Sequence, residues 1–123
     1  MSLRGRCNCG AVRFALLSAP VEPLACHCTQ CRKQSGHYMA DAEVQESEIV
    51  IEGEVRWYHA SETARRGFCP VCGSGLFWQR LGSGDVGFSL GALEGPTGLR
   101  LEKHIHTASK GDYYEIADGL PQE

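Results

Sequence analysis

Short stretches of alternating or β-branched residues recur along the chain, and glycine, proline, serine and aspartate separate them. In residues 10–17, the apolar Val12, Phe14 and Leu16 alternate with smaller or polar residues, which is typical of a half-buried strand. The same criteria predict further strands over residues 21–26, 38–44, 49–52, 55–59, 76–79, 86–90 and 101–105. The pattern therefore predicts an all-β protein built from small twisted sheets.

The segments between these strands have their own signals. Residues 29–35 are predicted to form one helical turn, whereas the polar residues Ser61 to Arg66 are predicted to form a loop. Residues 91–98 contain two turn signals around a proline, and residues 118–123 are predicted to be a surface tail or a weakly docked terminus. No repeat or low-complexity tract divides the chain.

Composition narrows the class of protein. A chain of 123 residues with 42% hydrophobic residues fits one compact domain, and 15 glycines indicate many turns. The formal net charge of −3 gives no electrostatic attraction to nucleic acid or to an anionic membrane, so neither is expected as a partner. No run of about 18 apolar residues is present, and the N-terminus lacks the apolar core of a signal peptide. We therefore expect a cytoplasmic protein.

Seven cysteines occupy three clusters in the sequence. Cytosolic thiols stay reduced, so clustered cysteines in that compartment are more often metal ligands than disulfides, and an odd number disfavours a complete disulfide framework. A closed structural zinc site uses four protein ligands, whereas a reactive zinc site uses three and keeps one position open. Seven thiols are what one site of each kind would require.

The two outer clusters supply two cysteines each and are predicted to form the closed site. Its four ligands are Cys7, Cys9, Cys69 and Cys72. Gly10 and Gly73 directly follow the second cysteine of each pair, where they permit a positive φ. In a strand, residues 7 and 9 would project to one face, so both thiolates could reach one ion. The alternative is four unliganded cysteines in the core.

The middle cluster supplies three thiolates within six residues, from Cys26, Cys28 and Cys31. The fourth position could belong to a histidine, a carboxylate, water or an incoming substrate thiol. His27 would point to the opposite face of a strand from its neighbours, whereas His104 and His106 share a strand face and could approach from elsewhere. Such a site can bind a small-molecule thiol and deprotonate it.

Charged and aromatic residues near the clusters have more than one interpretation. Cations beside a zinc–thiolate centre can offset its negative charge, bind substrate carboxylates, or simply be solvated. These cations are Arg32, Lys33, Arg65 and Arg66. The larger aromatic residues are expected in the core or in a pocket wall rather than in a cofactor site; they are Trp57, Phe77, Trp78 and Phe88.

The motifs together resemble the glutathione-dependent formaldehyde-activating family, also called the CENP-V/GFA domain. The resemblance rests on C-x-C-G-A-V-R-F from residue 7, C-H-C-x-x-C-R-K-x-S-G from residue 26, and G-F-C-P-x-C-G-S-x-L-F-W from residue 67. Weaker support comes from K-H-I at residues 103–105 and K-G-D-Y-Y-E-I-A-D-G-L-P-Q at residues 110–122. The resemblance covers nearly the whole chain.

The resemblance implies a single zinc-binding domain over residues 1–123 with a β-tent fold of twisted antiparallel sheets, related to the zinc fold of a Rab exchange factor. It implies two Zn²⁺ per chain, a structural ion on the outer four cysteines and a reactive ion on Cys26, Cys28 and Cys31. The family activity is a carbon–sulfur lyase reaction that joins glutathione and formaldehyde as S-hydroxymethylglutathione. The expected partners are therefore a small thiol and an aldehyde.

Two other functions remain open from the sequence alone. Both zinc ions could be structural, in which case the domain would be a non-catalytic module that binds another protein. Alternatively, the three-cysteine cluster could bind a metal or a thiol reversibly as a sensor, without turnover. The response of the second metal site to an added thiol separates these functions from the enzymatic one.

Overall fold

The computed structural model describes residues 3–123, which form two β-sheets and one short helix. No helix among the described residues is long and apolar enough to cross a membrane. The strands are β1 (Arg4–Arg6), β2 (Arg13–Leu16), β3 (Val21–Cys26), β4 (Met39–Gln45), β5 (Ile49–Glu52), β6 (Arg56–His59), β7 (Ala64–Phe68), β8 (Gly75–Arg80), β9 (Asp85–Ser89) and β10 (Lys103–Ile105). The helix is α1 (Thr29–Ser35), and the 3-10 turns are η1 (Glu46–Glu48), η2 (Leu90–Ala92) and η3 (Thr107–Ser109). The expectation of a mostly β protein is confirmed.

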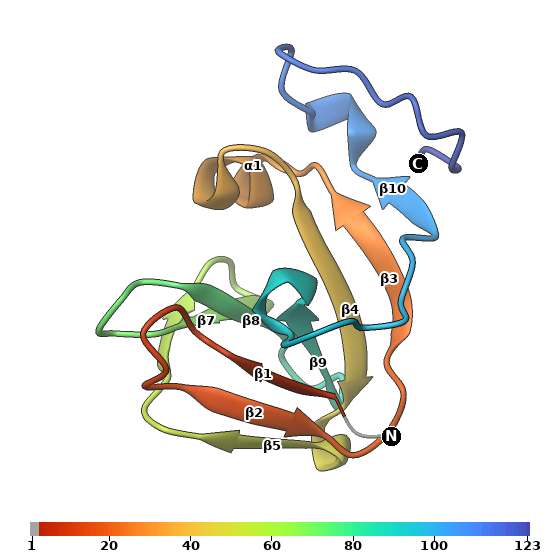
Figure 1. Cartoon of the computed structure of the whole chain (residues 1–123). Helices are drawn as coiled ribbons and strands as arrows, with labels where there is room; N and C mark the ends of the chain where they lie inside the picture. The colour runs from red at the N-terminus through yellow and green to blue at the C-terminus, as the bar shows by residue number, and fades with distance from the viewer. Residues whose placement is uncertain (1–2) are drawn as a thin grey trace.

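The smaller sheet has three strands in the order β1-β2-β5, and the larger has seven in the order β10-β3-β4-β9-β8-β7-β6. Every neighbouring pair is antiparallel except β10 and β3, which are parallel. The prediction of purely antiparallel sheets is therefore wrong at this edge. A parallel neighbour needs a long crossover connection, and β10 lies far along the chain from β3. Figure 1 shows β3 and β4 extending beyond the body of the sheets, with α1 and β10 at their far ends.

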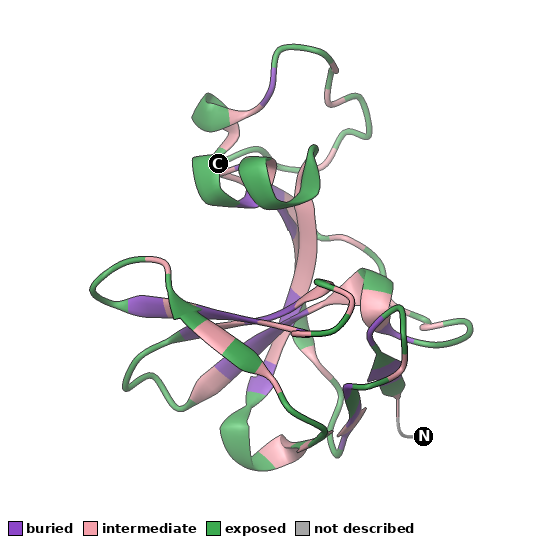
Figure 2. Ribbon diagram, turned by 90° about the vertical axis from the view of Figure 1, so that its left-hand side faces the viewer, coloured by how far each residue is buried: buried purple, intermediate pink, exposed green. Residues whose placement is uncertain are grey.

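The main core lies between the two sheets. Phe14 of β2 packs edge-on against Phe77 of β8 with ring centroids 5.3 Å apart, and it lies 5.8 Å from the ring of Phe88 in β9. Such aromatic pairs contribute about 0.5–1.5 kcal/mol each beyond their buried area. Cys7 and Cys69 belong to the same buried cluster, so the first cysteine site is continuous with the core. Figure 2 shows that most buried positions lie on strands, whereas the connecting turns are mostly exposed.

Two predicted segments differ most from the structure. Residues 61–66 were expected to form a loop, but residues 64–68 form β7, because Arg66 is buried and Arg65 places its guanidinium 4.0 Å from the centroid of the Trp57 ring. The strand predicted over residues 10–17 begins only at Arg13. The cysteines at positions 7 and 9 lie in the turn between β1 and β2 instead of in a strand.

The last residues pack back onto β10. The backbone N–H of His104 donates to the carbonyl of Pro121 at 2.8 Å, and the N–H of Glu123 donates to the carbonyl of His104 at 2.8 Å. The N–H of Thr107 donates to the carbonyl of Glu123 at 2.9 Å. Residues 118–123 are therefore a docked segment, and Figure 1 shows the end of the chain beside β10.

Candidate metal centres

The four outer cysteines come together in one tight cluster, which we call the quartet. Its Sγ atoms, from Cys7, Cys9, Cys69 and Cys72, all lie within 4.8 Å of one another. The sulfur of Cys9 is 3.6 Å from that of Cys7 and 3.8 Å from that of Cys69. A tetrahedron with metal–sulfur bonds of about 2.3 Å has edges of about 3.8 Å. The spacing therefore fits four ligands of one tetrahedral ion, and it is far longer than a disulfide of about 2.05 Å.

The turn between β1 and β2 holds the first two sulfurs. The N–H of Gly10 donates to the carbonyl of Cys7 at 3.1 Å, and Gly10 adopts a φ of 82°. Backbone N–H groups point at both thiols: that of Val12 lies 3.3 Å from the Sγ of Cys7, and that of Ala11 lies 3.4 Å from the Sγ of Cys9. Such donors favour the thiolate over the thiol. The pKa of Cys7 is lowered, whereas burial and the neighbouring sulfurs outweigh the Ala11 N–H and raise the pKa of Cys9 to about 11. The turn thus brings two sulfurs together, and Cys9 becomes a thiolate only when a metal displaces its proton.

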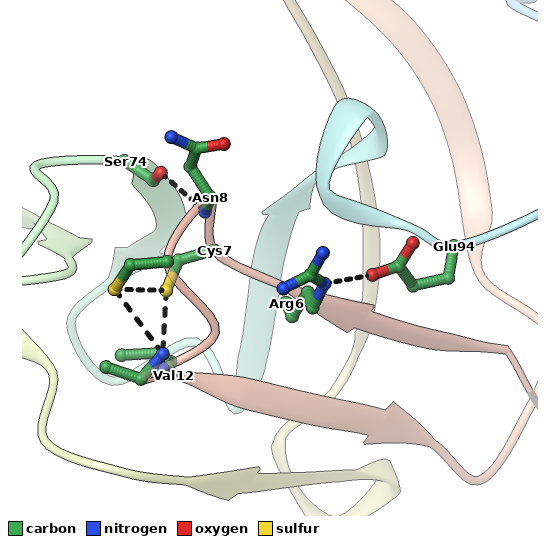
Figure 3. A network of polar contacts seen from close by, with 8 residues as sticks. Arg6, Cys7, Asn8, Val12, Ser74 and Glu94 are labelled. Atoms are coloured by element: carbon green, nitrogen blue, oxygen red, sulfur yellow. Dashed lines mark hydrogen bonds and ion pairs between the residues drawn. The ribbon is translucent and has the colours of Figure 1, made fainter.

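The turn between β7 and β8 supplies the other pair in the same way. Gly73 has a φ of 79°, and the N–H of Val71 donates to the Sγ of Cys69 at 3.4 Å. The Ser74 hydroxyl lies 3.1 Å from the Sγ of Cys72 and lowers the pKa of that thiol to about 5. The same hydroxyl accepts from the backbone N–H of Asn8 at 3.1 Å, which joins the two turns (Figure 3). The predicted positive φ at both glycines is confirmed.

The middle three cysteines form a second cluster, which we call the trio, at the junction of β3 and α1. Cys26 ends β3, Cys28 is the N-cap of α1, and Cys31 lies in its first turn. Their Sγ atoms all lie within 4.8 Å of one another. The N–H of Cys31 donates to the Sγ of Cys28 at 3.3 Å, so the helix cap itself fixes two of the sulfurs.

The trio differs from the quartet because it opens into a cleft of about 650 Å³. All three of its cysteines line this cleft, opposite Trp78 of β8 and Asp41 of β4. Burial raises the pKa of the half-buried Asp41 carboxyl to about 7. The arrangement can hold a metal through three thiolates and leave its fourth position facing a space large enough for a small molecule.

A buried arginine contacts the trio and also lines the cleft. Arg66 of β7 is only 6% exposed, and its Nη2 lies 3.5 Å from the Sγ of Cys31. A hydrogen bond from Cys26, opposed by burial and aided by Arg66, lowers the pKa of Cys31 to about 5. At least one sulfur of the trio is therefore a thiolate at neutral pH.

A buried histidine pair lies behind the trio. His27 Nε2 and His104 Nδ1 are 2.8 Å apart, His104 Nε2 lies 2.7 Å from the Asp118 carboxylate, and His27 Nδ1 is hydrogen-bonded to the Tyr114 hydroxyl. Asp118 only accepts, so His104 must donate from Nε2 and accept from His27 at Nδ1, and His27 must then accept from Tyr114. This donor order satisfies every ring nitrogen with both imidazoles neutral. Burial lowers the pKa of His27, which agrees with that state.

Comparison with known proteins identifies the family. The model of the glutathione-dependent formaldehyde-activating enzymes matches residues 2–109. The chain belongs to this family. A relative from Halomonas elongata, named "Putative glutathione-dependent formaldehyde-activating enzyme", is 33% identical over 87 residues, which are 63% of this chain and 55% of the relative. The chain thus spans about half the length of that relative.

Two further similar proteins match more of the chain. An uncharacterized lyase of Schizosaccharomyces pombe is 25% identical over 116 residues, covering 93% of this chain and 85% of the relative. A Rhodobacter sphaeroides protein of known crystal structure superposes with a TM-score of 0.60 at 30% identity, covering 76% of this chain and 89% of that chain. The name of the Schizosaccharomyces pombe relative describes that protein as a lyase.

The structure places the three histidines considered as possible ligands in different surroundings. The interpretation of His27 as a poor ligand agrees with its engagement by Tyr114 and His104. His104 and His106 do not share a strand face, because β10 ends at Ile105 and His106 takes a left-handed backbone with φ of 55°. His106 instead lines the cleft.

The predicted cations and aromatics also take distinct places. Within residues 3–123, Arg66 is the only one of the four predicted cations that donates a hydrogen bond to a sulfur of the trio. Arg65 instead donates to Gln79 and stacks on the ring of Trp57. Phe77 and Phe88 lie in the core, and Trp78 forms part of the cleft wall. Sequence reasoning missed Asp41, which follows no motif, and the partners of the histidines, which lie within the weaker motifs near the end of the chain.

Proposed function

We propose that this protein is a zinc-dependent carbon–sulfur lyase of the glutathione-dependent formaldehyde-activating type. In this proposal a small thiol, glutathione or a similar molecule, adds to an aldehyde and gives an S-hydroxymethyl-type adduct. The observation that supports it is the contrast between the two clusters. The quartet offers a full set of four sulfurs, whereas the trio offers three and opens into a cleft.

Zinc is the ion that suits both donor sets, since it favours tetrahedral coordination by thiolates and occurs in closed and open sites. We assign a structural Zn²⁺ to the quartet and a reactive Zn²⁺ to Cys26, Cys28 and Cys31, within a single domain of the β-tent type. A zinc ion at an open site lowers the pKa of a thiol that binds it, which makes the thiolate available at neutral pH.

The residues around the cleft suit the addition step. The thiolate sulfur attacks the carbonyl carbon, one C–S bond forms, the electron pair of the C=O π bond moves to oxygen, and that oxygen takes a proton. All atoms of the thiol and the aldehyde remain in the adduct. Asp41 faces the cleft, and its pKa of about 7 suits it to hold and donate that proton. Trp78 provides an apolar wall that limits water around the reacting groups.

The proposal can be tested through the metals themselves. We expect two metal ions per chain, and in a cobalt-substituted sample we expect glutathione to change the visible absorption of one ion only. Formation of the adduct with formaldehyde, followed by NMR, should exceed the rate of the uncatalysed reaction. If added thiol changes the visible absorption of neither metal ion, the enzymatic proposal is refuted and the binding module is favoured.

Matched cysteine variants assign the response to a site. Cys28→Ser should abolish the glutathione-dependent change while one metal stays bound and the chain stays folded. Cys9→Ser, which changes one sulfur of the quartet, should instead lower folding stability, since metal binding at a closed site contributes directly to folding. Reversible thiol binding without adduct formation would favour a sensor.

A further inference from the structure

Arg66 directs its guanidinium entirely towards α1 and the trio. Its Nε donates to Oε1 of Gln30 at 3.1 Å, its Nη1 donates to Oε1 of Gln34 at 2.9 Å, and its Nη2 donates to the Sγ of Cys31 at 3.5 Å. The two glutamines lie one helical turn apart on α1, at positions i and i+4. The fork of the guanidinium is therefore fixed by three contacts from one short segment.

Each glutamine is itself held in place. The Nε2 of Gln30 donates to the carbonyl of Ala60 at 3.2 Å. The amide of Gln34 packs over Gly75, where a Cβ would lie only 2.3 Å from the glutamine Nε2. Gly75 thus leaves the space that the amide needs. The guanidinium therefore cannot move without breaking its contacts with α1.

A buried cation needs an anionic counterpart, because an isolated charge is very costly to bury. Both glutamine contacts of Arg66 are neutral, so they satisfy hydrogen bonds without balancing charge. The anionic groups that act on it are the sulfurs of Cys31 and Cys28 and, more weakly, the carboxylate of Asp41. Burial would lower the pKa of Arg66, but the contact with Cys31 outweighs it and raises that pKa.

The quartet has no such cation. Among residues 3–123, its sulfurs accept from backbone N–H groups and from Ser74, and no lysine or arginine donates to them. Arg65, the neighbour of Arg66 in β7, points to the other face of the strand, where Gln79 accepts from it at 2.7 Å. The fold therefore places one buried positive charge at the open cluster and none at the closed cluster.

We infer that Arg66 is a positioning residue that makes the open site selective for an anionic fourth ligand. The inference rests on the proposed metal ligation by the trio. Three thiolates around a divalent ion leave one net negative charge, and an incoming thiolate adds a second. The guanidinium offsets one of them through Cys31. A neutral ligand brings no second charge and gains much less from Arg66, so the class of molecule selected is a thiol that binds as its thiolate.

Ligand charge provides the test. In cobalt-substituted protein saturated with metal, the absorption of the trio site would be titrated with 2-mercaptoethanol, which binds as an anion, and with imidazole, which binds as a neutral molecule. Arg66→Gln should weaken thiol binding at least about tenfold more than imidazole binding, since a charge a few ångströms away is worth more than that factor at a protein's effective dielectric. Arg66→Lys should restore most of the preference, and Arg65→Gln should leave both affinities unchanged.

A second variant covers the case in which Arg66→Gln does not fold. Gln34→Glu keeps the size of an exposed side chain and places a carboxylate on the guanidinium, so it should reduce the same preference. Equal weakening of thiol and imidazole in these variants would overturn the inference and leave Arg66 a structural role only. A wild-type site that binds no thiol would refute the proposed function instead, so the two failures are distinguishable.

Discussion

Replacing His104 with phenylalanine removes the hydrogen bond within the buried histidine pair and, with it, the hydrogen bond to Asp118. The phenyl ring occupies nearly the same space as the imidazole, so it leaves no large cavity. It removes both ring nitrogens, however, and the Nε2–H of His27 loses its acceptor. The side chain of His27 is fully buried, so water cannot replace that acceptor.

The magnitude follows from this unpaired donor. A buried polar group left without a partner costs about 1–3 kcal/mol of folding free energy. His27→Phe should cost a similar amount, because it leaves His104 Nδ1 without a donor. The double variant removes both partners at once, and replacing both by apolar groups is nearly neutral. We therefore expect the double variant to be more stable than the sum of the single effects predicts, by about 1–3 kcal/mol.

Urea unfolding followed by tryptophan fluorescence measures these differences. The free zinc concentration must be the same for all four proteins, since a ligand that binds only the folded state shifts apparent stability. With a slope of about 1–3 kcal/mol/M, a loss of 2 kcal/mol moves the midpoint by roughly 1 M. Single variants within about 0.5 kcal/mol of wild type, or a double variant that equals the sum, would refute the hydrogen-bond coupling of the two imidazoles.

Three further changes test the core, a turn and the half-buried carboxyl of Glu43. Phe14→Ala should lower the free energy of unfolding by about 3–5 kcal/mol, because it removes the ring that packs between the two sheets and leaves a cavity there. A urea midpoint near that of wild type would contradict this. Gly53→Ala should lower the melting temperature by at least about 4 °C. Gly53 has a φ of 94°, and a Cβ there would lie 2.1 Å from the carbonyl oxygen of Ala11. An unchanged melting temperature would show that the turn can rearrange. Burial and, to a smaller extent, the charge of Asp85 raise the pKa of Glu43. The folded state therefore binds this proton more tightly than the unfolded state does, and the protein loses stability as pH rises through that pKa. Glu43→Gln should therefore stabilise the protein at pH 7.5 with a gain that shrinks towards pH 5, whereas equal gains in urea midpoint at both pH values would exclude this cause.

The elements that sequence reasoning predicted correctly are those with a local pattern. Alternation around Phe14 predicted β2, and the segment after the central cysteines predicted α1. The spacing of the cysteines also predicted which four and which three come together, because paired ligands with adjacent glycines imply metal-binding turns. Their role as zinc ligands stays a prediction.

The elements that were missed depend on contacts distant in sequence. β7 contains two adjacent arginines, a polar pattern that resembles a loop, and only the partners of Arg65 and Arg66 explain why a strand forms there. The parallel pairing of β10 with β3 has no local signal, because no turn connects the two strands. For the same reason the contact between His27 and His104 could not be predicted from either neighbourhood.

The trio lies beside late residues of the chain, because Cys26 pairs with Ile105 of β10, and this has a consequence for synthesis on the ribosome. The quartet has all of its sulfurs once Cys72 has been made, whereas the histidine pair behind the trio is complete only after Asp118. At about 5–20 residues per second, the second event follows the first by roughly 2–9 seconds. The first cluster can thus capture metal and begin to order the sheets while the thiols of the second are still without their support. In a growing chain, those three thiols are the ones left open longest to oxidation or to the wrong metal.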